Sequence, residues 1–413
     1  MSWVKAQFSS LFLEPTRNGI YKAADSHGSG CKIINMGEIF GYSFIGGQDM
    51  SRITVDEAEL QRFHVKAGDL LFARRSLVES GAGKCSIVNV INESIVFESS
   101  IIRVRLNQAI ADPLFYMYWM RSLAGRTAIG AIVTGLNVKG IRSSDLSNIE
   151  VEVPPLETQK AISSILRSYD ELIETYQKQI KSLEEAALRL YKEWFVDLRF
   201  PGHESAKIVD GIPEGWSFRT LGELTTKFAT GLNPRKNFVL GKGSNYYVTI
   251  KNMANNRVVF DDKCDRVDND ALVKINRRSD LQQGDLLFSG IGTIGRVAMI
   301  DKPVQNWNIS ESVFTMRPIQ SISSVYLFLM MLNDDIQSYC QANAHGCAQK
   351  GIRMADLKAY KTLIAPQELM DSFTRIVTPY ISASHKINDQ ILHLTEARDR
   401  LLPKLMSREI EVK

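Results

Sequence analysis

The sequence predicts an α+β protein made of two related halves, each a globular domain followed by a long helix. Three observations predict this fold class. Residues 139–190 recur, without gaps, as residues 350–401. Both copies carry apolar residues spaced seven apart, as in coiled-coil helices. Short β-rich runs between glycine-rich turns precede each copy. We therefore expect two α+β domains and two long antiparallel coiled-coil helices, related by a pseudo-twofold internal repeat.

The chain has 413 residues, which exceeds one ordinary domain. We expect a first globular domain at 1–153 and a first helical region at 154–200. A second globular domain follows at 201–364, and a second helical region at 365–413. Hydrophobic residues make up 44% and charged residues 23%, which is typical of globular proteins. The net charge of +4 permits nucleic-acid binding without requiring it.

The repeat is stronger than composition can produce. Seventeen of the 52 aligned pairs are identical, whereas composition alone would give about three. The motif KGIR at 139–142 recurs at 350–353, and GDLLF at 68–72 recurs at 284–288. The offset is 211 residues for KGIR and 216 for GDLLF. We infer that the globular domains diverged by insertions while the helical regions kept their register.

The helical regions carry an apolar line that we interpret as a coiled-coil seam. The first helix leads into the second domain and the second helix leaves it, so a packed pair must be antiparallel. Amphipathic helices that each pack on their own domain are the alternative. We expect Pro379 to kink the second helix or delay its start, and Pro403 to end it early. The predicted seam consists of Ile162, Tyr169, Tyr176, Leu183 and Leu190, with Phe373, Tyr380, Ile387, Leu394 and Leu401.

The globular regions read as mixtures of strands and helices. Runs such as CKIINM, YYVTIKNM and RVAMI predict strands. The stretches DPLFYMYWMRSLAG and SVYLFLMMLNDDIQSYC predict one helical segment in each domain.

Motifs for catalysis are missing from the sequence. GAGKCS at 81–86 lacks the spacing and the Ser/Thr of a phosphate loop, and no G-x-G-x-x-G or H-E-x-x-H occurs. No adenine-methyltransferase motif of the NPPY type is present either; NPR at 233–235 is the nearest match. We therefore expect no catalytic residues, no metal and no cofactor in this chain.

Cysteine use and hydropathy indicate a cytoplasmic protein. The five cysteines form no C-x-x-C pair, which is typical of a reducing compartment. Cys340, His345 and Cys347 lie close together, and we interpret the thiols as buried rather than metal-binding. The N-terminus lacks a signal-peptide core, and the apolar run 326–332 is too short to cross a bilayer.

Polar residues suited to DNA occur in both globular regions. Arg and Asn pair bidentately with guanine and adenine edges, whereas Lys and Arg contact phosphates. For any single residue, a solvated surface charge is the alternative. Lys139, Arg142, Lys350 and Arg353 are interpreted as phosphate contacts or as salt bridges at the domain–helix junctions. The remaining candidates are Arg74, Arg75, Arg235, Lys236, Lys251, Asn252, Asn256 and Arg257.

The chain resembles the specificity subunit of Type I restriction–modification enzymes. The resemblance rests on VPPLETQKAISSIL at 153–166, its counterpart IAPQELMDSFTRIV at 364–377, GIPEGWSFRTLGEL at 211–224 and both GDLLF copies. It covers essentially the whole chain. The second copy departs from the first, since Met370 replaces Gln159 and Ala365 replaces Pro154.

The resemblance implies two target-recognition domains, each reading one half of a split site in double-stranded DNA. It also implies helices that set the spacer and dock two methyltransferase subunits. Those partners would bind S-adenosylmethionine, and motor-nuclease subunits would complete the restriction complex. Two alternatives stay open at this stage: a stand-alone two-lobed scaffold that binds proteins, and a single-chain DNA-modifying enzyme.

Overall fold

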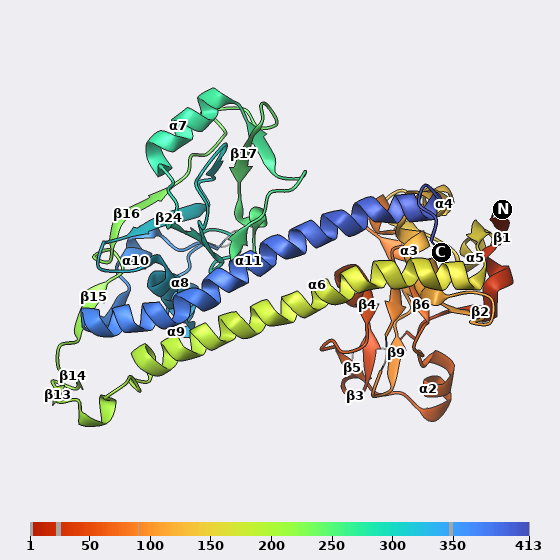
Figure 1. Ribbon diagram of the computed structural model, residues 1–413, viewed down its shortest axis with the longest axis horizontal. Coiled ribbons are helices and arrows are strands. Elements are labelled where there is room, and N and C mark those ends of the chain that lie inside the picture. The colour runs from red at the N-terminus through yellow and green to blue at the C-terminus, as the bar shows by residue number, and fades with distance from the viewer. Residues whose placement is uncertain (1–2, 22–25, 90, 347–349, 413) are drawn as a thin grey trace. The chain divides into compact units, whose positions relative to one another are not determined.

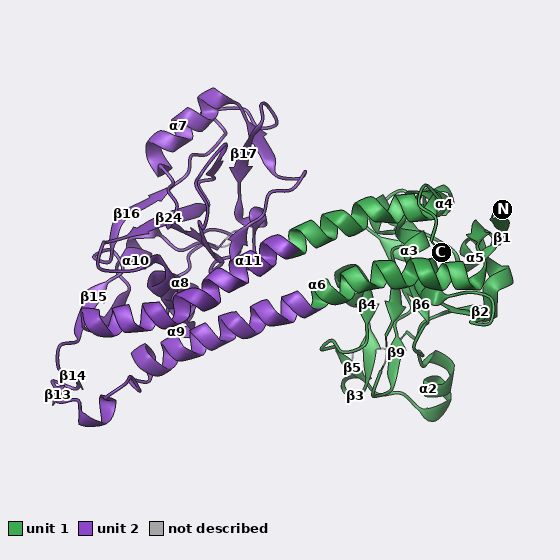
Figure 2. Ribbon diagram, in the orientation of Figure 1, with its two compact units in different colours: residues 1–174, 391–413 green, residues 175–390 purple. Residues whose placement is uncertain are grey.

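The computed structural model describes residues 3–21, 26–89, 91–346 and 350–412 (Figure 1). It divides into two compact units, residues 1–174 with 391–413 and residues 175–390 (Figure 2). Helix α6 (Leu156–Tyr191) and helix α11 (Gln367–Met406) each run through both units. Each unit therefore combines one globular part with a portion of both long helices.

The globular part of unit 1 holds a five-stranded sheet of order β2-β10-β6-β8-β4 and a three-stranded sheet of order β5-β3-β9. Strand β1 pairs with β12, which leads into α6. The strands are β1 (Val4–Gln7), β2 (Phe12–Asn18), β3 (His27–Ile34), β4 (Phe44–Ile45), β5 (Arg52–Ile53), β6 (Leu70–Ala73), β7 (Arg75–Ser76), β8 (Cys85–Val88), β9 (Ile95–Phe97), β10 (Ile101–Leu106), β11 (Lys139–Gly140) and β12 (Glu150–Val153). The helices are α1 (Met36–Gly41), α2 (Glu57–Phe63), α3 (Pro113–Arg121), α4 (Leu123–Ile132) and α5 (Ser143–Ser147).

Unit 2 repeats this plan with a four-stranded sheet of order β16-β24-β21-β22 and a three-stranded sheet of order β20-β17-β23. Strand β15 pairs with β25, which leads into α11. The strands are β13 (Ile208–Val209), β14 (Ile212–Pro213), β15 (Ser217–Thr220), β16 (Thr225–Thr230), β17 (Asn245–Val248), β18 (Met253–Ala254), β19 (Arg257–Val258), β20 (Asp265–Val267), β21 (Leu286–Ser289), β22 (Val297–Met299), β23 (Trp307–Ile309), β24 (Val313–Pro318) and β25 (Lys361–Ile364). The helices are α7 (Asn269–Ser279), α8 (Ser324–Leu332), α9 (Asp334–Ala342) and α10 (Met354–Lys358).

The internal repeat is present in the strand pairing as well as in the sequence. In both three-stranded sheets the central strand has one parallel and one antiparallel neighbour. In both larger sheets the GDLLF strand, β6 or β21, pairs antiparallel with two neighbours. The predicted mixed fold with two related globular domains and two long helices is confirmed.

Each predicted helical stretch is a pair of helices. The break falls at Ser122 between α3 and α4, and at Asn333 between α8 and α9. The side chain of each break residue accepts a hydrogen bond from a backbone N–H of the following helix. Short polar side chains at such positions stabilise a new helix start, which explains why one continuous helix does not form.

The predictions that Pro379 would delay the start of the second helix and that Pro403 would end it early were wrong, whereas a kink at Pro379 stays a prediction. Helix α11 begins at Gln367, twelve residues before Pro379, and it continues past Pro403 to Met406. Pro379 removes one backbone donor, whose acceptor would be the carbonyl of Arg375, four residues back. Both residues are exposed, so water can satisfy that carbonyl. Helix α6 agrees with prediction, and a π-helical turn, Lys192–Val196, follows it.

The two long helices contact each other inside each unit. In unit 1, Arg398 of α11 donates to the Asp170 carboxylate of α6. In unit 2, Ser384 of α11 donates to Glu184 of α6 at 2.7 Å. The α6 residue number rises from 170 to 184 while its α11 partner falls from 398 to 384, so the helices are antiparallel. Both contacts are fourteen residues apart on either helix, which is two heptads.

Candidate nucleic-acid interface

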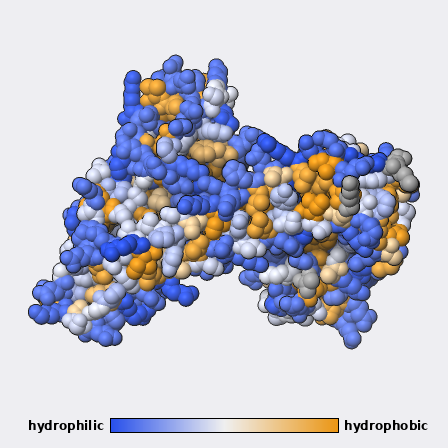
Figure 3. Space-filling view, in the orientation of Figure 1, coloured by the Kyte–Doolittle hydropathy of each residue, from blue (hydrophilic) through white to orange (hydrophobic). Residues whose placement is uncertain are grey.

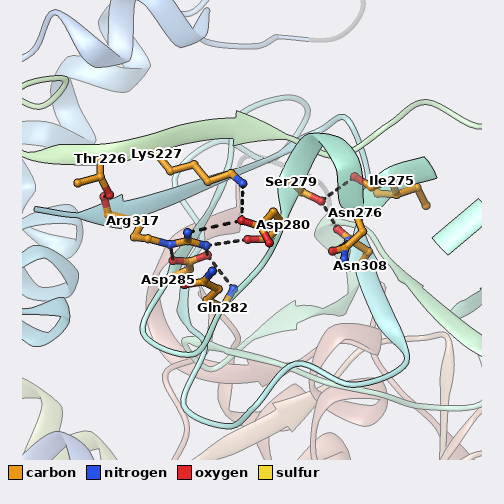
Figure 4. A network of polar contacts seen from close by, with 10 residues as sticks. All are labelled: Thr226, Lys227, Ile275, Asn276, Ser279, Asp280, Gln282, Asp285, Asn308 and Arg317. Atoms are coloured by element: carbon orange, nitrogen blue, oxygen red, sulfur yellow. Dashed lines mark hydrogen bonds and ion pairs between the residues drawn. The ribbon is translucent and has the colours of Figure 1, made fainter. Parts of the chain in front are cut away.

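A buried arginine–aspartate pair supports the GDLLF strand in each unit. Arg105 of β10 binds the Asp69 carboxylate through two nitrogens, at 2.7 Å each. Arg317 of β24 binds Asp285 in the same way, at 2.7 and 2.9 Å (Figure 4). Both aspartates are at most 1% exposed. The hydrogen bonds that each arginine donates to its aspartate raise the pKa of that arginine. The GDLLF motif therefore stabilises the sheet that both units share, whereas the loop that follows the motif can differ in sequence between the units.

In unit 1 the loop after GDLLF brings three basic candidates together. Arg75 lies on β7, which pairs with β11 so that Arg75 faces Gly140 and Ser76 faces Lys139. Arg75 and Arg142 are exposed, and Lys139 is partly buried. Arg74 is partly buried and donates to the Ser99 carbonyl oxygen at 3.5 Å. This edge, formed by Arg75, Lys139 and Arg142, is named the KGIR edge of unit 1.

Unit 2 has a corresponding edge with a different loop. Lys350 and Arg353 are exposed, and the Lys350 carbonyl oxygen accepts from Gly292 N at 2.7 Å. The residues after GDLLF are ARRS in the first half and SGIG in the second. The KGIR basic residues thus recur in both units, whereas the arginine pair Arg74–Arg75 does not.

Salt bridges at the domain–helix junctions were one predicted role for the KGIR basic residues. Over the described parts of the chain, Lys139, Arg142, Lys350 and Arg353 lie within 4.0 Å of no carboxylate. Their charges face solvent, which leaves phosphate contact as the remaining prediction.

A second basic surface in unit 2 combines a predicted loop with a helix that sequence reasoning missed. Arg235 and Lys236 are exposed in the loop before β17. Lys274 of α7 donates to the Asn237 carbonyl oxygen at 3.3 Å, which ties the helix to this loop. The missed residues are Lys274, Arg277 and Arg278, all exposed. Figure 3 shows mostly hydrophilic residues over α7 on the viewed face.

The sequence contained a signal for the α7 residues. Asp268 caps the helix by accepting from Ala271 N at 2.8 Å, and Ala271 and Ile275 are buried. Apolar residues four apart fix the inner face of a helix, so the basic run NRR at 276–278 projects outward.

Three of the predicted base-reading residues are engaged inside unit 2. Asn252 is 7% exposed, and its side-chain oxygen accepts from Thr249 N at 3.0 Å. Asn256 donates to Glu184 at 2.8 Å, and Arg257 donates to Asp301 at 2.8 Å. These side chains are occupied by internal hydrogen bonds, which makes them weaker candidates for base contact than exposed residues. Their neighbour Lys251 is exposed and remains a candidate for DNA contact.

The apolar line predicted as the seam is only partly buried. Ile162 and Phe373 are at most 1% exposed. Tyr380 is 36% exposed, and the other seam residues are partly buried: Tyr169, Tyr176, Leu183, Leu190, Ile387, Leu394 and Leu401. The fully buried positions of the long helices lie on a neighbouring line: Leu166, Asp170, Ile173, Ala187 and Tyr191 in α6, with Val377, Ile381 and Ser384 in α11.

A buried glutamine lies in the first turn of α6. The side chain of Gln159 accepts from Asp112 N at 2.8 Å and donates to the carbonyl oxygens of Pro154 at 2.8 Å and Ile110 at 3.2 Å. It thereby ties the start of α6 to the globular part of unit 1. In unit 2 the equivalent residue is Met370, which is buried in the apolar core.

No helix in the described parts of the chain is long and apolar enough to span a membrane. The described residues also contain no group of three His, Cys, Asp or Glu side chains arranged to hold a metal ion. Cys340 is buried, and burial raises the pKa of its thiol to about 12. Cys347 lies outside the described residues.

A family model described as "Type I restriction modification DNA specificity domain" matches residues 32–185 and 213–393. The MjaIX specificity subunit of a Type I restriction enzyme from Methanocaldococcus jannaschii is 24% identical over 73% of this chain and 70% of its own length. The HindI specificity subunit from Haemophilus influenzae is 21% identical over 84% and 87%. A crystal structure of the S subunit of a Type I restriction–modification system from M. genitalium is 17% identical, covers 98% of this chain and 96% of that chain, and has a TM-score of 0.57.

Proposed function

Because the chain belongs to the Type I restriction–modification DNA specificity family, we propose that each of its globular parts reads one half of a bipartite DNA site. The chain is a DNA specificity subunit with two target-recognition domains, and it is itself non-catalytic. It forms part of a Type I restriction–modification complex. The proposal rests on one observation: both units share the same core sheet structure, but the loops that follow its GDLLF strands differ in sequence. The order of the four strands that the larger sheets share and the Arg–Asp pair recur in both units, while the loops after GDLLF differ.

We propose two kinds of DNA contact. Phosphates are the same in every half-site, so residues that repeat in both units suit them: Lys139 and Arg142 with Lys350 and Arg353. Bases differ between half-sites, so basic residues peculiar to one unit suit base edges. In unit 1 the candidate is Arg75, with Arg74 beside it. In unit 2 the candidates are Arg235, Lys236 and Lys251, together with Lys274, Arg277 and Arg278 of α7.

We also propose that the long helices dock two copies of a methyltransferase subunit. Several residues are identical at equivalent positions of the two helices. Because these residues are exposed to solvent, packing inside the protein does not explain their identity. The exposed identical pairs are Gln179 with Gln390, Glu185 with Glu396, Ala186 with Ala397, and Arg189 with Arg400. Two surface patches with the same residues would suit two copies of the same partner. Those partners would carry S-adenosylmethionine and methylate adenine after flipping the base out of the duplex. Motor-nuclease subunits would complete the restriction complex.

Methylation mapping with a domain exchange tests the proposal. Residues 1–150 are replaced by the equivalent region of another specificity subunit, and methylated adenines are mapped genome-wide with the methyltransferase present. One half of the recognised sequence should change while the other half and the spacer remain. An assembled complex in which both halves change would contradict the proposal.

A single-chain modifying enzyme or a protein scaffold would behave differently. The first would transfer label from S-adenosylmethionine to unmodified DNA without a partner. The second would show no duplex binding that falls steeply with salt.

A further inference from the structure

Asn256 and Arg257, two of the candidates that are engaged inside unit 2, belong to a polar cluster there. Arg257 of β19 donates to Asp301 at 2.8 Å, to Asp389 of α11 at 3.0 Å and to the His385 carbonyl oxygen at 3.2 Å. Lys302 binds the other Asp389 oxygen at 2.8 Å. Arg257 therefore connects the end of β22 and the hairpin β18–β19 to one face of α11.

Neighbouring contacts extend this connection to both long helices. Asn256 donates to Glu184 of α6 at 2.8 Å, and Ser384 of α11 donates to the same glutamate at 2.7 Å. His385 Nδ1 lies 3.2 Å from Asp301. The group Asn256, Arg257, Asp301, His385 and Asp389, with Glu184 and Lys302, is named the latch.

The latch is held firmly at its centre. The side chains of Arg257 and His385 are 15% and 10% exposed, and that of Asp301 is 24% exposed. Burial raises the pKa of Asp301, but the hydrogen bond from His385 and the charge of Arg257 outweigh it and lower that pKa to about 2. The hairpin reaches the helices through a tight turn in which Asn255 and Asn256 have φ of 50° and 58°. Asparagine tolerates this left-handed conformation better than most residues.

The repeat shows that the latch is not part of the shared frame. The positions equivalent to Ser384, His385 and Asp389 are Ile173, Glu174 and Lys178. In unit 1, one contact between the globular part and α6 is made by Arg167, which lies 3.8 Å from the Phe44 ring centroid and also binds Glu174 of α6 at 2.9 Å. The arginine comes from the helix in unit 1 and from the globular part in unit 2. The two recognition domains are therefore fixed to the helices by different contacts.

We propose that the latch determines spacer specificity: Arg257 is a positioning residue that holds the second recognition domain at one angle on the long helices, so that only one distance between half-sites is accepted. The proposal rests on the proposed function. One base pair moves a half-site by about 3.4 Å and turns it by about 34°, given about 10.5 base pairs per turn. The apolar core that packs β21 and α8 against the long helices limits the position of the domain, and the directional hydrogen bonds of the latch resist the remaining displacement.

The test uses the full chain assembled with its methyltransferase partner. Three DNA substrates carry the mapped site with its natural spacer, or with one base pair added or removed. Initial methylation rates are compared for the wild type, Arg257→Met and Asp389→Asn. Asp389→Asn weakens the latch from the helix side, at a side chain that is 34% exposed, and serves if Arg257→Met does not assemble. Arg266→Met is the matched control, because Arg266 packs on Tyr246 and donates to the Ser244 carbonyl oxygen.

We expect the latch variants to lower the rate ratio between natural and altered spacers by about tenfold, the scale of one lost charged hydrogen bond. Base changes within either half-site should still abolish methylation, and Arg266→Met should keep the wild-type ratio. A loss of overall rate with an unchanged ratio would overturn the proposal, because a merely structural residue behaves that way. A wild type that ignores the second half-site would overturn the proposed function and the latch proposal together.

Discussion

At the scale of single residues, the structure separates arginines that build the frame from arginines that are free to bind. Arg105 and Arg317 are committed to buried aspartates, and Arg257 is committed to the latch. Arg75 is exposed on an edge that also carries Lys139 and Arg142. An arginine whose donors are already satisfied gains little from a base, so exposed donors are the better candidates.

Arg75→Ala is expected to weaken binding of the correct site by about 1–3 kcal/mol if Arg75 reads a base. If Arg75 contacts only phosphate, the substitution would weaken binding to all DNA sequences equally. It would also reduce by about one the slope of log affinity against log salt concentration. Fluorescence anisotropy with specific and unrelated duplexes at several salt concentrations separates these results. Arg317→Met cannot replace Arg75→Ala in this test, because it would leave the Asp285 carboxylate buried without its ion-pair partner. Unchanged affinity and salt slope would show that Arg75 lies on a free surface.

Asp301 makes a pH-dependent contribution to stability. Its pKa is lowered to about 2 in the folded protein, against an ordinary value of 3.8. A lowered folded pKa gives stability that is complete above the unfolded pKa and is lost as the pH falls through the folded one. We expect the wild type to lose about 2 kcal/mol relative to Asp301→Asn between pH 4 and pH 2. Urea unfolding of both proteins across this range measures the difference. A constant difference would contradict the assigned ion pair.

The internal repeat drew attention to single residues that occur twice. It singled out the KGIR residues, whose contact with DNA stays a prediction, whereas no role was predicted for Asp69 and Asp285 of the GDLLF motifs. The roles of Asn256 and Arg257 could not be predicted, because their partners Glu184 and Asp389 are distant in the sequence and meet them only in the folded protein. Asn252 bonds instead to Thr249, three residues back, in a local capping turn that the sequence pattern did not reveal. A polar cluster after a strand looks the same in the sequence whether it faces DNA or a helix.

At the scale of elements, the two long helices differ in how their repeat-related contacts are made. In unit 1, Tyr118 donates to Asp170 at 2.5 Å and Arg398 donates to the same buried carboxylate. The equivalent residues in unit 2 are Leu329, Ile381 and Ala187, and all three are buried. The repeat thus uses a polar triad in one unit and an apolar triad in the other.

Removing one partner of the polar triad should be costly, whereas replacing all three should not. Arg398→Ala leaves Asp170 charged and buried, and we expect a loss of about 3–5 kcal/mol. The triple variant Tyr118→Leu, Asp170→Ile and Arg398→Ala installs the unit 2 set, and it should recover most of that loss. Urea unfolding of both variants provides the measurement, with Arg400→Ala as a control at an exposed position. A triple variant as unstable as Arg398→Ala would show that the apolar set does not fit unit 1.

The helical elements were the part of the fold that the sequence predicted best, because their repeat and spacing are local properties. The buried line was predicted less well, since the seven-residue spacing of Tyr169, Tyr176 and Leu183 competes with the line through Leu166, Ile173 and Ala187. Both lines are apolar in the sequence, and only packing selects between them. Pro379 misled the prediction for a related reason, because a proline on the exposed side of a long helix costs less than one in the core.

At the scale of the whole molecule, the proposed function makes the long helices the ruler between half-sites. The two interhelical contacts bound a segment on each helix, residues 170–184 of α6 and 384–398 of α11. Tyr176 and Ile391 lie inside these segments, and Ile391 lies beyond Asp389, the last latch residue of α11. An insertion after each of them leaves both contacts and the latch in place and lengthens both helices together.

One heptad inserted after Tyr176 and one after Ile391 should lengthen the helix pair by about 10.5 Å, at about 1.5 Å per residue. The spacer should then grow by about three base pairs if the helices lie along the duplex, given about 3.4 Å per pair. Three pairs also rotate a half-site by about 100°, so the lengthened complex should methylate more slowly. Methylation mapping of the variant gives the new spacer directly, and a variant with a heptad in α6 alone is the control, because its unpaired helix should assemble poorly. If the double-insertion variant assembles and methylates sites with the original spacer, then the partner subunits, and not these helices, set the distance between half-sites.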